Sequence, residues 1–461
     1  MNSSTQFPKN FIWGAAASSY QIEGAAREDG KGLSVWDEFC CREGVIKSNE
    51  SGEIACDHYH RFREDIRLLK EIGVKAYRLS ISWPRVLPEG IGTPNAKGIA
   101  FYSELIDCLL EQGIEPWITL FHWDYPLALF NKGGWLCRES AEWFAQYARV
   151  VVDALSDRVS HWMTINEPRC FIGYGHHTGY HAPGLKLSFP EVLRAAHHAL
   201  LGHGKAVATI RARAKTAPVI GVAPDSFVKF PATETEADIR AARASMFAVN
   251  AKNVFNNNWF SDPMVLGRYP EDGVALFGGD MPRVPAADME MISQPLDFFG
   301  INIYQGAAIR AGADGAPQPV PLTPGRPLTA MEWSVTPHAL YWGPKFFYER
   351  YHLPVVITEN GMAGCDWVHA DGRVRDPQRI DFVKRYLREY ARAINDGVDG
   401  RGYFYWSIVD NFEWAEGYAK RFGLVHVDYA TQKRTIKDSG LWYREVIESN
   451  GAIIFKNGET A

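Results

Sequence analysis

The most informative part of the sequence is Pro354-Val355-Val356-Ile357-Thr358-Glu359-Asn360-Gly361. Its apolar and β-branched residues, 355–358, predict a short strand that is buried on both faces. The strand ends in Glu359, and a carboxylate buried without a partner is so costly that such a group is usually paired or used in chemistry. Taken alone, this pattern also allows Glu359 to cap a following helix.

A second stretch, Trp162-Met163-Thr164-Ile165-Asn166-Glu167-Pro168, repeats this form. An apolar strand again runs into a carboxylate and then into a residue that breaks the chain's regular structure. Two strand-end glutamates so far apart in the sequence suggest that two carboxyl groups meet at one rim of a barrel. Such a pair is what the hydrolysis of a glycosidic bond requires.

Residues 164–168 and 357–361 resemble the acid/base and nucleophile motifs of glycoside hydrolase family 1, the β-glucosidase family. The resemblance runs from Phe11-Ile12-Trp13-Gly14 to Lys420-Arg421-Phe422-Gly423-Leu424. It implies a retaining β-glucosidase that removes terminal non-reducing β-D-glucosyl residues from cello-oligosaccharides and from aryl or alkyl β-glucosides. A covalent glucosyl-enzyme, transglycosylation and side activity on β-galactosides or β-fucosides belong to the same expectation.

Length and composition agree with a globular enzyme. The chain has 461 residues, of which 46% are hydrophobic and 22% charged, and a (β/α)₈ barrel with insertions reaches this size. The formal net charge of −5 provides no basic footprint for nucleic acid. No apolar run reaches the ~18 residues of a membrane span, and the polar start of the chain lacks the apolar core of a secretory signal.

The seven cysteines are odd in number and form no CxxC pair, which indicates neither a disulfide framework nor a zinc site. Reduced thiols are the simpler interpretation, and they favour a cytoplasmic location.

Strand and helix patterns alternate along the chain and predict an α/β fold with a parallel sheet. Eight such units match a single (β/α)₈ TIM barrel over 1–461 with loop insertions at its C-terminal face, and no linker divides the chain. We expect a Gly/Pro-rich insertion over the site at 311–329 and disordered tails at about 1–8 and 456–461. The expected strands cover 11–16, 76–81, 116–120, 161–166, 219–223, 297–304, 355–358 and 402–407. The expected helices cover 57–72, 102–112, 141–156, 190–215, 237–255, 337–351 and 379–395.

Polar residues gather where these strands end, which is where barrel enzymes carry their chemistry. Each residue alone allows a structural explanation, His122 as a buried histidine and Glu413 as a solvated loop acid. The family resemblance implies specific roles: Glu167 as acid/base, Glu359 as nucleophile, and Arg78 and Tyr304 as partners that keep Glu359 ionised. It further implies a substrate-binding set of Gln21, His122, Asn166, Asn302, Tyr304, Trp333, Trp406, Glu413, Trp414 and Phe422. Trp406 would be the stacking platform, and Trp333 the aromatic of the leaving-group subsite.

The chain departs from the family pattern beside Glu167. Arg169 stands where many relatives carry an aromatic, and Tyr174 where a smaller apolar residue is common. With Cys170, these residues would line the channel to the leaving-group subsites and weaken inhibition by glucose. The alternative is that Arg169 points away and pairs with a surface acid.

Two other functions stay open. A 6-phospho-β-glucosidase is disfavoured because Glu413 and Glu416 would repel a phosphate dianion. A non-catalytic sugar-binding barrel would be expected to have lost one of the paired glutamates. The retaining route needs neither metal nor organic cofactor and places the two carboxyl groups ~5–5.5 Å apart. The partners expected are small β-glucosides and glucose, and the sequence leaves open a monomer or a small homo-oligomer.

Overall fold

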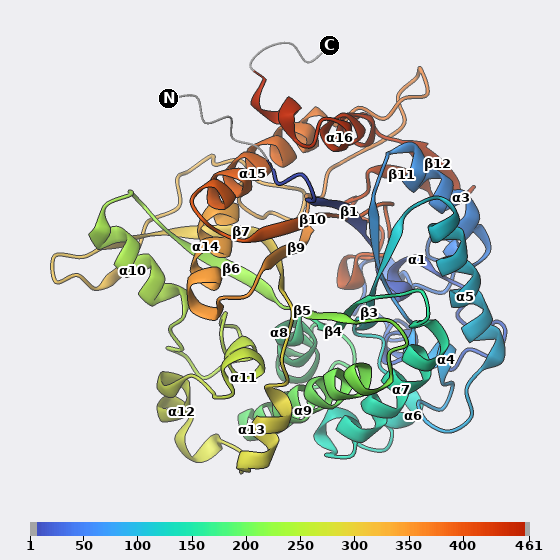
Figure 1. Cartoon of the computed structure of the whole chain (residues 1–461), viewed down its shortest axis with the longest axis horizontal. Coiled ribbons are helices and arrows are strands. Elements are labelled where there is room, and N and C mark those ends of the chain that lie inside the picture. Colours follow the sequence, from blue (N-terminus) through green and yellow to red (C-terminus); the bar gives the residue numbers. More distant parts are fainter. Residues whose placement is uncertain (1–6, 457–461) are drawn as a thin grey trace.

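The computed structural model describes residues 7–456 and shows a barrel of parallel strands surrounded by helices (Figure 1). The strands follow the order β5-β4-β3-β2-β1-β10-β9-β7-β6 in one sheet. All pairings along this path are parallel. Their bounds are β1 Ile12–Ala16, β2 Ala76–Ser80, β3 Glu115–Phe121, β4 His161–Asn166, β5 Val219–Ala223, β6 Asp225–Pro231, β7 Phe299–Ala311, β9 Val355–Asn360 and β10 Gly400–Trp406.

The barrel closes at Pro224. Only this residue separates β5, which pairs with β4, from β6, which pairs with β7. Strands β5 and β6 therefore act as one bent strand, and the closed sheet has eight strand positions. The predicted (β/α)₈ barrel is confirmed, with Glu167 directly after the fourth strand and Glu359 near the end of the seventh.

The surrounding helices turn apolar stripes toward the barrel. In α3, for example, Phe62, Ile66 and Leu69 are buried at helical spacing. The principal helices are α3 His58–Glu71, α5 Ala96–Glu111, α7 Ser140–Leu155, α9 Phe189–Arg213, α10 Glu236–Met246, α14 Ala339–Tyr351, α15 Pro377–Asn395 and α16 Asp438–Glu448. Residues 317–319 in the predicted insertion form β8, Pro317–Pro319, which pairs antiparallel with β7.

The prediction of a helix over 237–255 is wrong for its second half, because α10 ends at Met246. The segment that follows is rich in asparagine, whose amides compete with helical backbone bonds. Asn253 Oδ1 accepts a hydrogen bond from the Phe255 amide at 2.8 Å, and Asn257 Nδ2 donates to the Met246 carbonyl at 2.9 Å. The sequence prediction also missed β6 and the outer part of β7, which continue past the barrel rim.

Phe7 belongs to the core although the sequence placed it in a tail. Its side chain is buried, and its ring centroid lies 4.6 Å from that of Phe11 and 4.8 Å from that of Trp13. Pro8 and Lys456 are also described, and residues 1–6 and 457–461 of the predicted tails lie outside the described residues. The assignment of the whole chain to one domain stays a prediction.

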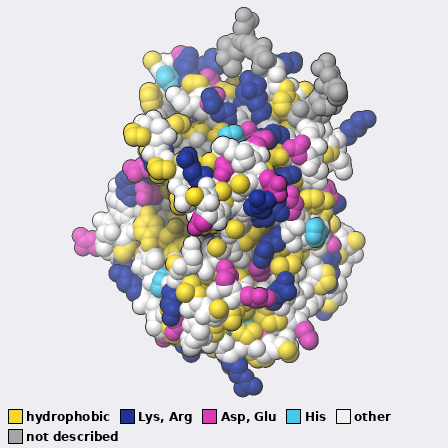
Figure 2. Space-filling view, turned by 90° about the vertical axis from the view of Figure 1, so that its left-hand side faces the viewer, with side chains coloured by type: hydrophobic (Ala, Val, Ile, Leu, Met, Phe, Trp, Pro, Cys, Tyr) yellow, Lys and Arg dark blue, Asp and Glu magenta, His cyan; other side chains and the backbone are white. Residues whose placement is uncertain are grey.

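The charged side chains on the surface agree with the small net charge of the sequence, −5. Figure 2 shows Lys/Arg and Asp/Glu side chains interspersed over one face of the molecule, without a large patch of one sign. Among residues 7–456, no helix has the length and apolar character needed to cross a membrane. All seven cysteines lie in this part of the chain and carry free thiols.

Candidate active site

The C-terminal ends of the barrel strands open into a cavity of about 760 Å³. This volume is within the range of small-molecule sites. Four predicted site residues, Gln21, Arg78, Asn166 and Asn302, are buried beneath its surface and bond to residues that line it. The predicted residues in its wall are His122, Glu167, Arg169, Cys170, Tyr174, Tyr304, Trp333, Glu359, Trp406, Glu413, Trp414 and Phe422.

Glu359 is buried and held on both oxygens. Arg78 Nη1 lies 2.5 Å from its Oε1, and the Tyr304 hydroxyl donates to its Oε2 at 2.7 Å. Burial raises the pKa of Glu359, while the Arg78 guanidinium and the Tyr304 hydroxyl act in the opposite direction. This carboxyl group therefore has a full set of partners that favour its anion.

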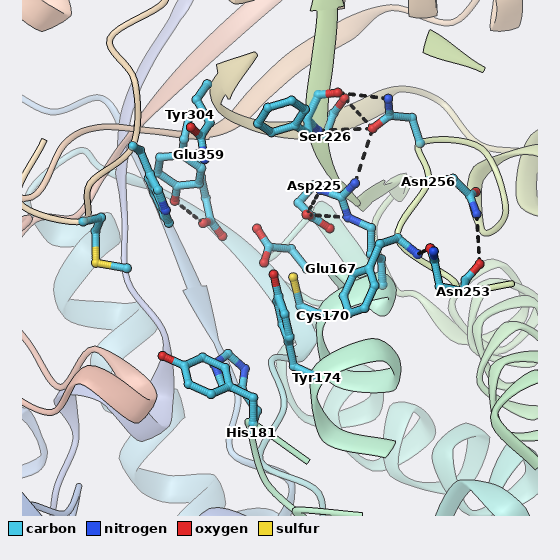
Figure 3. A pocket seen from close by; sticks show the side chains of 18 of the residues that line it. Glu167, Cys170, Tyr174, His181, Asp225, Ser226, Asn253, Asn256, Tyr304 and Glu359 are labelled. Atoms are coloured by element: carbon cyan, nitrogen blue, oxygen red, sulfur yellow. Dashed lines mark hydrogen bonds and ion pairs between the residues drawn. The ribbon is translucent and has the colours of Figure 1, made fainter. Parts of the chain in front are cut away.

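Glu167 has different surroundings. It follows β4 in a left-handed backbone conformation with φ of 45°, a strained geometry for a residue with a side chain. Asn302 Nδ2 donates to its Oε1 at 2.7 Å. Burial, the Asp225 carboxylate and the Glu359 carboxylate raise the pKa of Glu167 well above its ordinary value. In Figure 3, Glu167 lies between Glu359 on one side and Asp225 on the other.

A hydrogen-bond network beneath the cavity ties the two carboxyl groups together. Asn166 Oδ1 accepts from Arg78 Nη2 at 2.6 Å and from Asn302 Nδ2 at 3.1 Å. Its Nδ2 lies 3.1 Å from His122 Nε2. Burial, followed by the positive charge of Arg78, holds the pKa of His122 well below its usual value, so this ring is neutral. The prediction that these strand ends converge is confirmed.

Glu413 lies at another wall of the cavity. Gln21 Nε2 lies 3.4 Å from Glu413 Oε2 and donates shorter bonds to Asn411 and Phe412. Burial and the charge of Glu359 raise the pKa of Glu413 to about 8. Near neutral pH its carboxyl group can therefore both donate and accept hydrogen bonds, as ring hydroxyls demand.

Aromatic rings form much of the remaining wall. Trp406 stacks near the His122 ring, with centroids 5.8 Å apart and an interplanar angle of 16°. In another part of the wall, the ring centroid of Trp333 lies 5.2 Å from that of Tyr304 and 6.1 Å from that of Phe422. Flat apolar faces beside polar groups suit a sugar ring, which has both kinds of surface.

Arg169 pairs with Asp225 in the cavity wall. Arg169 Nε donates to Asp225 Oδ2 at 2.8 Å, and Nη2 contacts the same oxygen. Each side chain is only 13% exposed, so the partner of Arg169 is not a surface acid. Tyr174 also lines the cavity, with its ring 4.9 Å from Phe255. The sequence analysis placed Arg169 and Tyr174 near the channel, and both border the cavity.

Asp225 and Trp123 are cavity residues that the sequence analysis missed. Asp225 follows the 219–223 strand after a single proline, so it carries the same signal as Glu167 and Glu359, an acid at a strand end. Trp123 directly follows His122, and its ring lies 4.6 Å from that of Trp414.

A trio of possible metal ligands lies in this wall within residues 7–456. One oxygen each of Glu167 and Asp225 and the sulfur of Cys170 are within 4.8 Å of one another. Arg169 already places its positive charge on Asp225, and a guanidinium opposes a second cation. The trio fits an ion pair beside an acid better than a metal centre.

The family model of glycosyl hydrolase family 1 matches residues 3–452. The chain belongs to this family. It is 46% identical over 448 residues to β-glucosidase A of Thermotoga maritima, covering 97% of this chain and 98% of the relative. It is 40% identical over 470 residues to a bifunctional β-D-glucosidase/β-D-fucosidase of Bifidobacterium breve, covering 97% of this chain and 99% of the relative.

Solved structures agree with this assignment to glycosyl hydrolase family 1. The β-glucosidase of Thermotoga maritima in complex with glucoimidazole superposes with a TM-score of 0.89 at 45% identity, and the match covers 97% of this chain and all of the other. The resemblance stated from the two glutamate motifs is confirmed, and the protein is a glycoside hydrolase.

Proposed function

We propose that the protein is a retaining β-glucosidase in which Glu359 is the nucleophile and Glu167 the acid/base. The observation that carries the proposal is the unequal environment of two carboxyl groups in one cavity. Glu359 has a guanidinium and a phenol on its oxygens, whereas Glu167 has an amide on one oxygen and carboxylates nearby. Environments that separate two pKa values assign the base and acid roles.

In the first step Glu359 attacks the anomeric carbon and forms a glucosyl ester while Glu167 protonates the departing oxygen. Arg78 and Tyr304 make the Glu359 anion available. The raised pKa of Glu167 keeps its proton in place near neutral pH.

In the second step water replaces the aglycone. Glu167, now ionised, takes a proton from this water, which attacks the glucosyl ester and releases glucose with retained configuration. A separation of ~5–5.5 Å between the carboxyl groups stays a prediction for this route.

The glucosyl ring is held by Gln21, His122, Asn166 and Glu413 against Trp406 and Trp414. His122 and Asn166 are neutral groups that exchange hydrogen bonds with hydroxyls, while Glu413 can donate and accept. The substrates are cello-oligosaccharides and aryl or alkyl β-glucosides. Activity on β-fucosides is a second expectation, because a relative named as a bifunctional glucosidase/fucosidase shares 40% identity.

A 6-phospho-β-glucosidase is the less suitable alternative. Glu413 and Glu416 both line the cavity, and Lys420 points its ammonium group to the Ala330 carbonyl at 2.6 Å and lies 3.7 Å from Glu416. A phosphate dianion would meet two acids here. A cytoplasmic location accords with seven free thiols, of which Cys41 and Cys365 are exposed.

The test is turnover of aryl β-glucosides combined with trapping of the intermediate. A 2-fluoro glucoside should label the peptide that contains Glu359, and Glu359→Ala should lose turnover even of substrates with good leaving groups. Azide should restore a reaction in this variant and yield the α-glucosyl azide by one inversion. A label on Glu167 or Glu413 would refute the assignment, and absence of turnover by the native chain would favour a sugar-binding barrel.

A further inference from the structure

Asp225, the first residue of β6, lies beside Glu167 in the cavity wall (Figure 3). One of its carboxylate oxygens is within 4.8 Å of a Glu167 oxygen and of Cys170 Sγ. An acid that is only 13% exposed and this close to another acid is unfavourable unless something fixes it there. The fold must therefore supply a partner that keeps Asp225 in place.

Arg169 is that partner, and it leaves the Asp225 charge only partly balanced. Both hydrogen bonds that Arg169 donates to Asp225 end on Oδ2, while Arg169 Nη1 donates to Asn257 Oδ1 at 3.4 Å. Asp225 Oδ1 is buried and has no hydrogen-bond partner within residues 7–456. The guanidinium thus holds the carboxylate on one side, while Oδ1, which shares the delocalised negative charge, accepts no hydrogen bond within residues 7–456.

The groups that face Glu167 come from four elements, β6, β7, β9 and α8 (Pro168–Ile172). Glu359 of β9 and Asp225 of β6 are acids, while Tyr304 of β7 and Cys170 of α8 are weak acids nearby. Arg169, also of α8, reaches Glu167 only across Asp225, and Asn302 of β7 is a neutral donor. No cation in the described part of the chain forms an ion pair with Glu167 itself. Glu359 is consumed as its ester during the reaction, whereas Asp225 keeps its charge in both steps.

We propose that Asp225, held by Arg169, is a positioning residue that keeps Glu167 protonated until the leaving group departs. The inference rests on the proposed acid/base role of Glu167. Burial makes the largest contribution to the raised pKa of Glu167, and the Asp225 charge makes the next. Asp225 contacts neither the sugar nor the reacting atoms in this role; it acts through the electrostatic potential at Glu167.

The experiment is the pH dependence of kcat/KM for Asp225→Asn. Removing the negative charge lets Glu167 ionise at lower pH, so the basic limb of the profile moves down. Two unit charges about 4.8 Å apart, even screened as in bulk water, shift a pKa by about 0.6 unit, and a shift of this size or more is expected. A dinitrophenyl glucoside, whose leaving group needs no proton, should show no such shift in its basic limb.

Matched variants isolate the effect. Asp225→Glu keeps the charge and should return the limb toward that of the native enzyme, and Asp225→Ser removes the charge in case the asparagine variant does not fold. Asp153→Asn breaks an exposed Asp153–Arg213 pair with the same change in net charge and should leave the limb unchanged. An unshifted limb in both charge-removing variants would overturn the inference. If the basic limb of the kcat/KM profile persists in Glu167→Gln, the acid/base assignment of Glu167 would instead be overturned.

Discussion

Replacement of Arg78 by methionine tests the proposal that Arg78 keeps the nucleophile Glu359 ionised. Arg78 is 1% exposed and lies 2.5 Å from a Glu359 side chain that is 4% exposed. Breaking a buried ion pair by removing one partner costs about 3–5 kcal/mol. At about 1.4 kcal/mol per pKa unit, that cost corresponds to a rise of about 2–4 units in the pKa of Glu359.

The sign follows from the proposed role of Glu359. A nucleophile must be ionised to attack, so a higher pKa of Glu359 moves the acidic limb of the kcat/KM profile toward higher pH. We expect Arg78→Met to shift this limb upward by about 2 units or more, and below the limb to reduce kcat/KM by about 100-fold or more. The assay is a pH profile with a dinitrophenyl glucoside, which isolates the nucleophile because no proton need reach its leaving group.

A second buried pair provides the control. Arg85 Nε lies 2.8 Å from Glu23 Oε2, with side chains 1% and 5% exposed. Arg85→Met should lower the free energy of unfolding by an amount similar to Arg78→Met and leave the acidic limb in place. Tyr304→Phe removes only one donor and should shift the limb in the same direction by a smaller amount. If Arg78→Met and Tyr304→Phe both fold and neither moves the acidic limb, these residues do not set the ionisation of Glu359.

Three further predictions concern the glycone site, the channel and acid stability. Glu413→Ala should weaken transition-state binding, measured from kcat/KM, by about 2–4 kcal/mol with little change in Tm. Loss of folding with normal kinetics in the folded fraction would instead show that Glu413 is structural. Arg169→Trp and Tyr174→Leu, singly and together, should strengthen inhibition by glucose on cellobiose and on an aryl glucoside; changes below about twofold, under ~0.5 kcal/mol, would show that these residues do not gate the channel. His203 is fully buried and its pKa is lowered to about 3 by burial, below the unfolded value of about 6.5, so stability is lost as pH falls between these values. His203→Asn should reduce that slope by about one proton, ~1.4 kcal/mol per pH unit, in urea unfolding measured from pH 6 to pH 4, and an unchanged slope would contradict the assignment.

The strand-end acids could be predicted because their signal is local. A short apolar run that ends at Glu167 or Glu359 predicts a carboxyl group at the end of a strand, at the edge of the sheet. Asp225 carries the same signal, but Pro224 suggested that the strand had ended. The structure uses that proline, which has no backbone N–H to pair, as the bend between two strands that pair with different neighbours.

The pairing of Arg169 could not be read from the sequence for a different reason. Arg169 lies on α8 after β4, and its partner starts β6, which is 56 residues later in the chain. Whether the two side chains meet depends on the orientation of α8 relative to the barrel, and no local sequence pattern predicts that orientation. The burial of Gln21 beneath Glu413 likewise depends on a contact between residues 392 positions apart.

The two catalytic candidates are alike in residue type and in burial, so their difference must come from their neighbours. Arg78 comes from β2 and reaches Glu359 on β9, while Asp225 comes from β6 and faces Glu167 after β4. The barrel thus places a cation beside one carboxyl group and an anion beside the other. Because each glutamate also raises the pKa of the other when ionised, the measured limbs belong to the pair and not to single residues. A neighbour that stabilises the Glu359 anion therefore also supports the proton on Glu167, and one electrostatic arrangement serves both halves of the first chemical step.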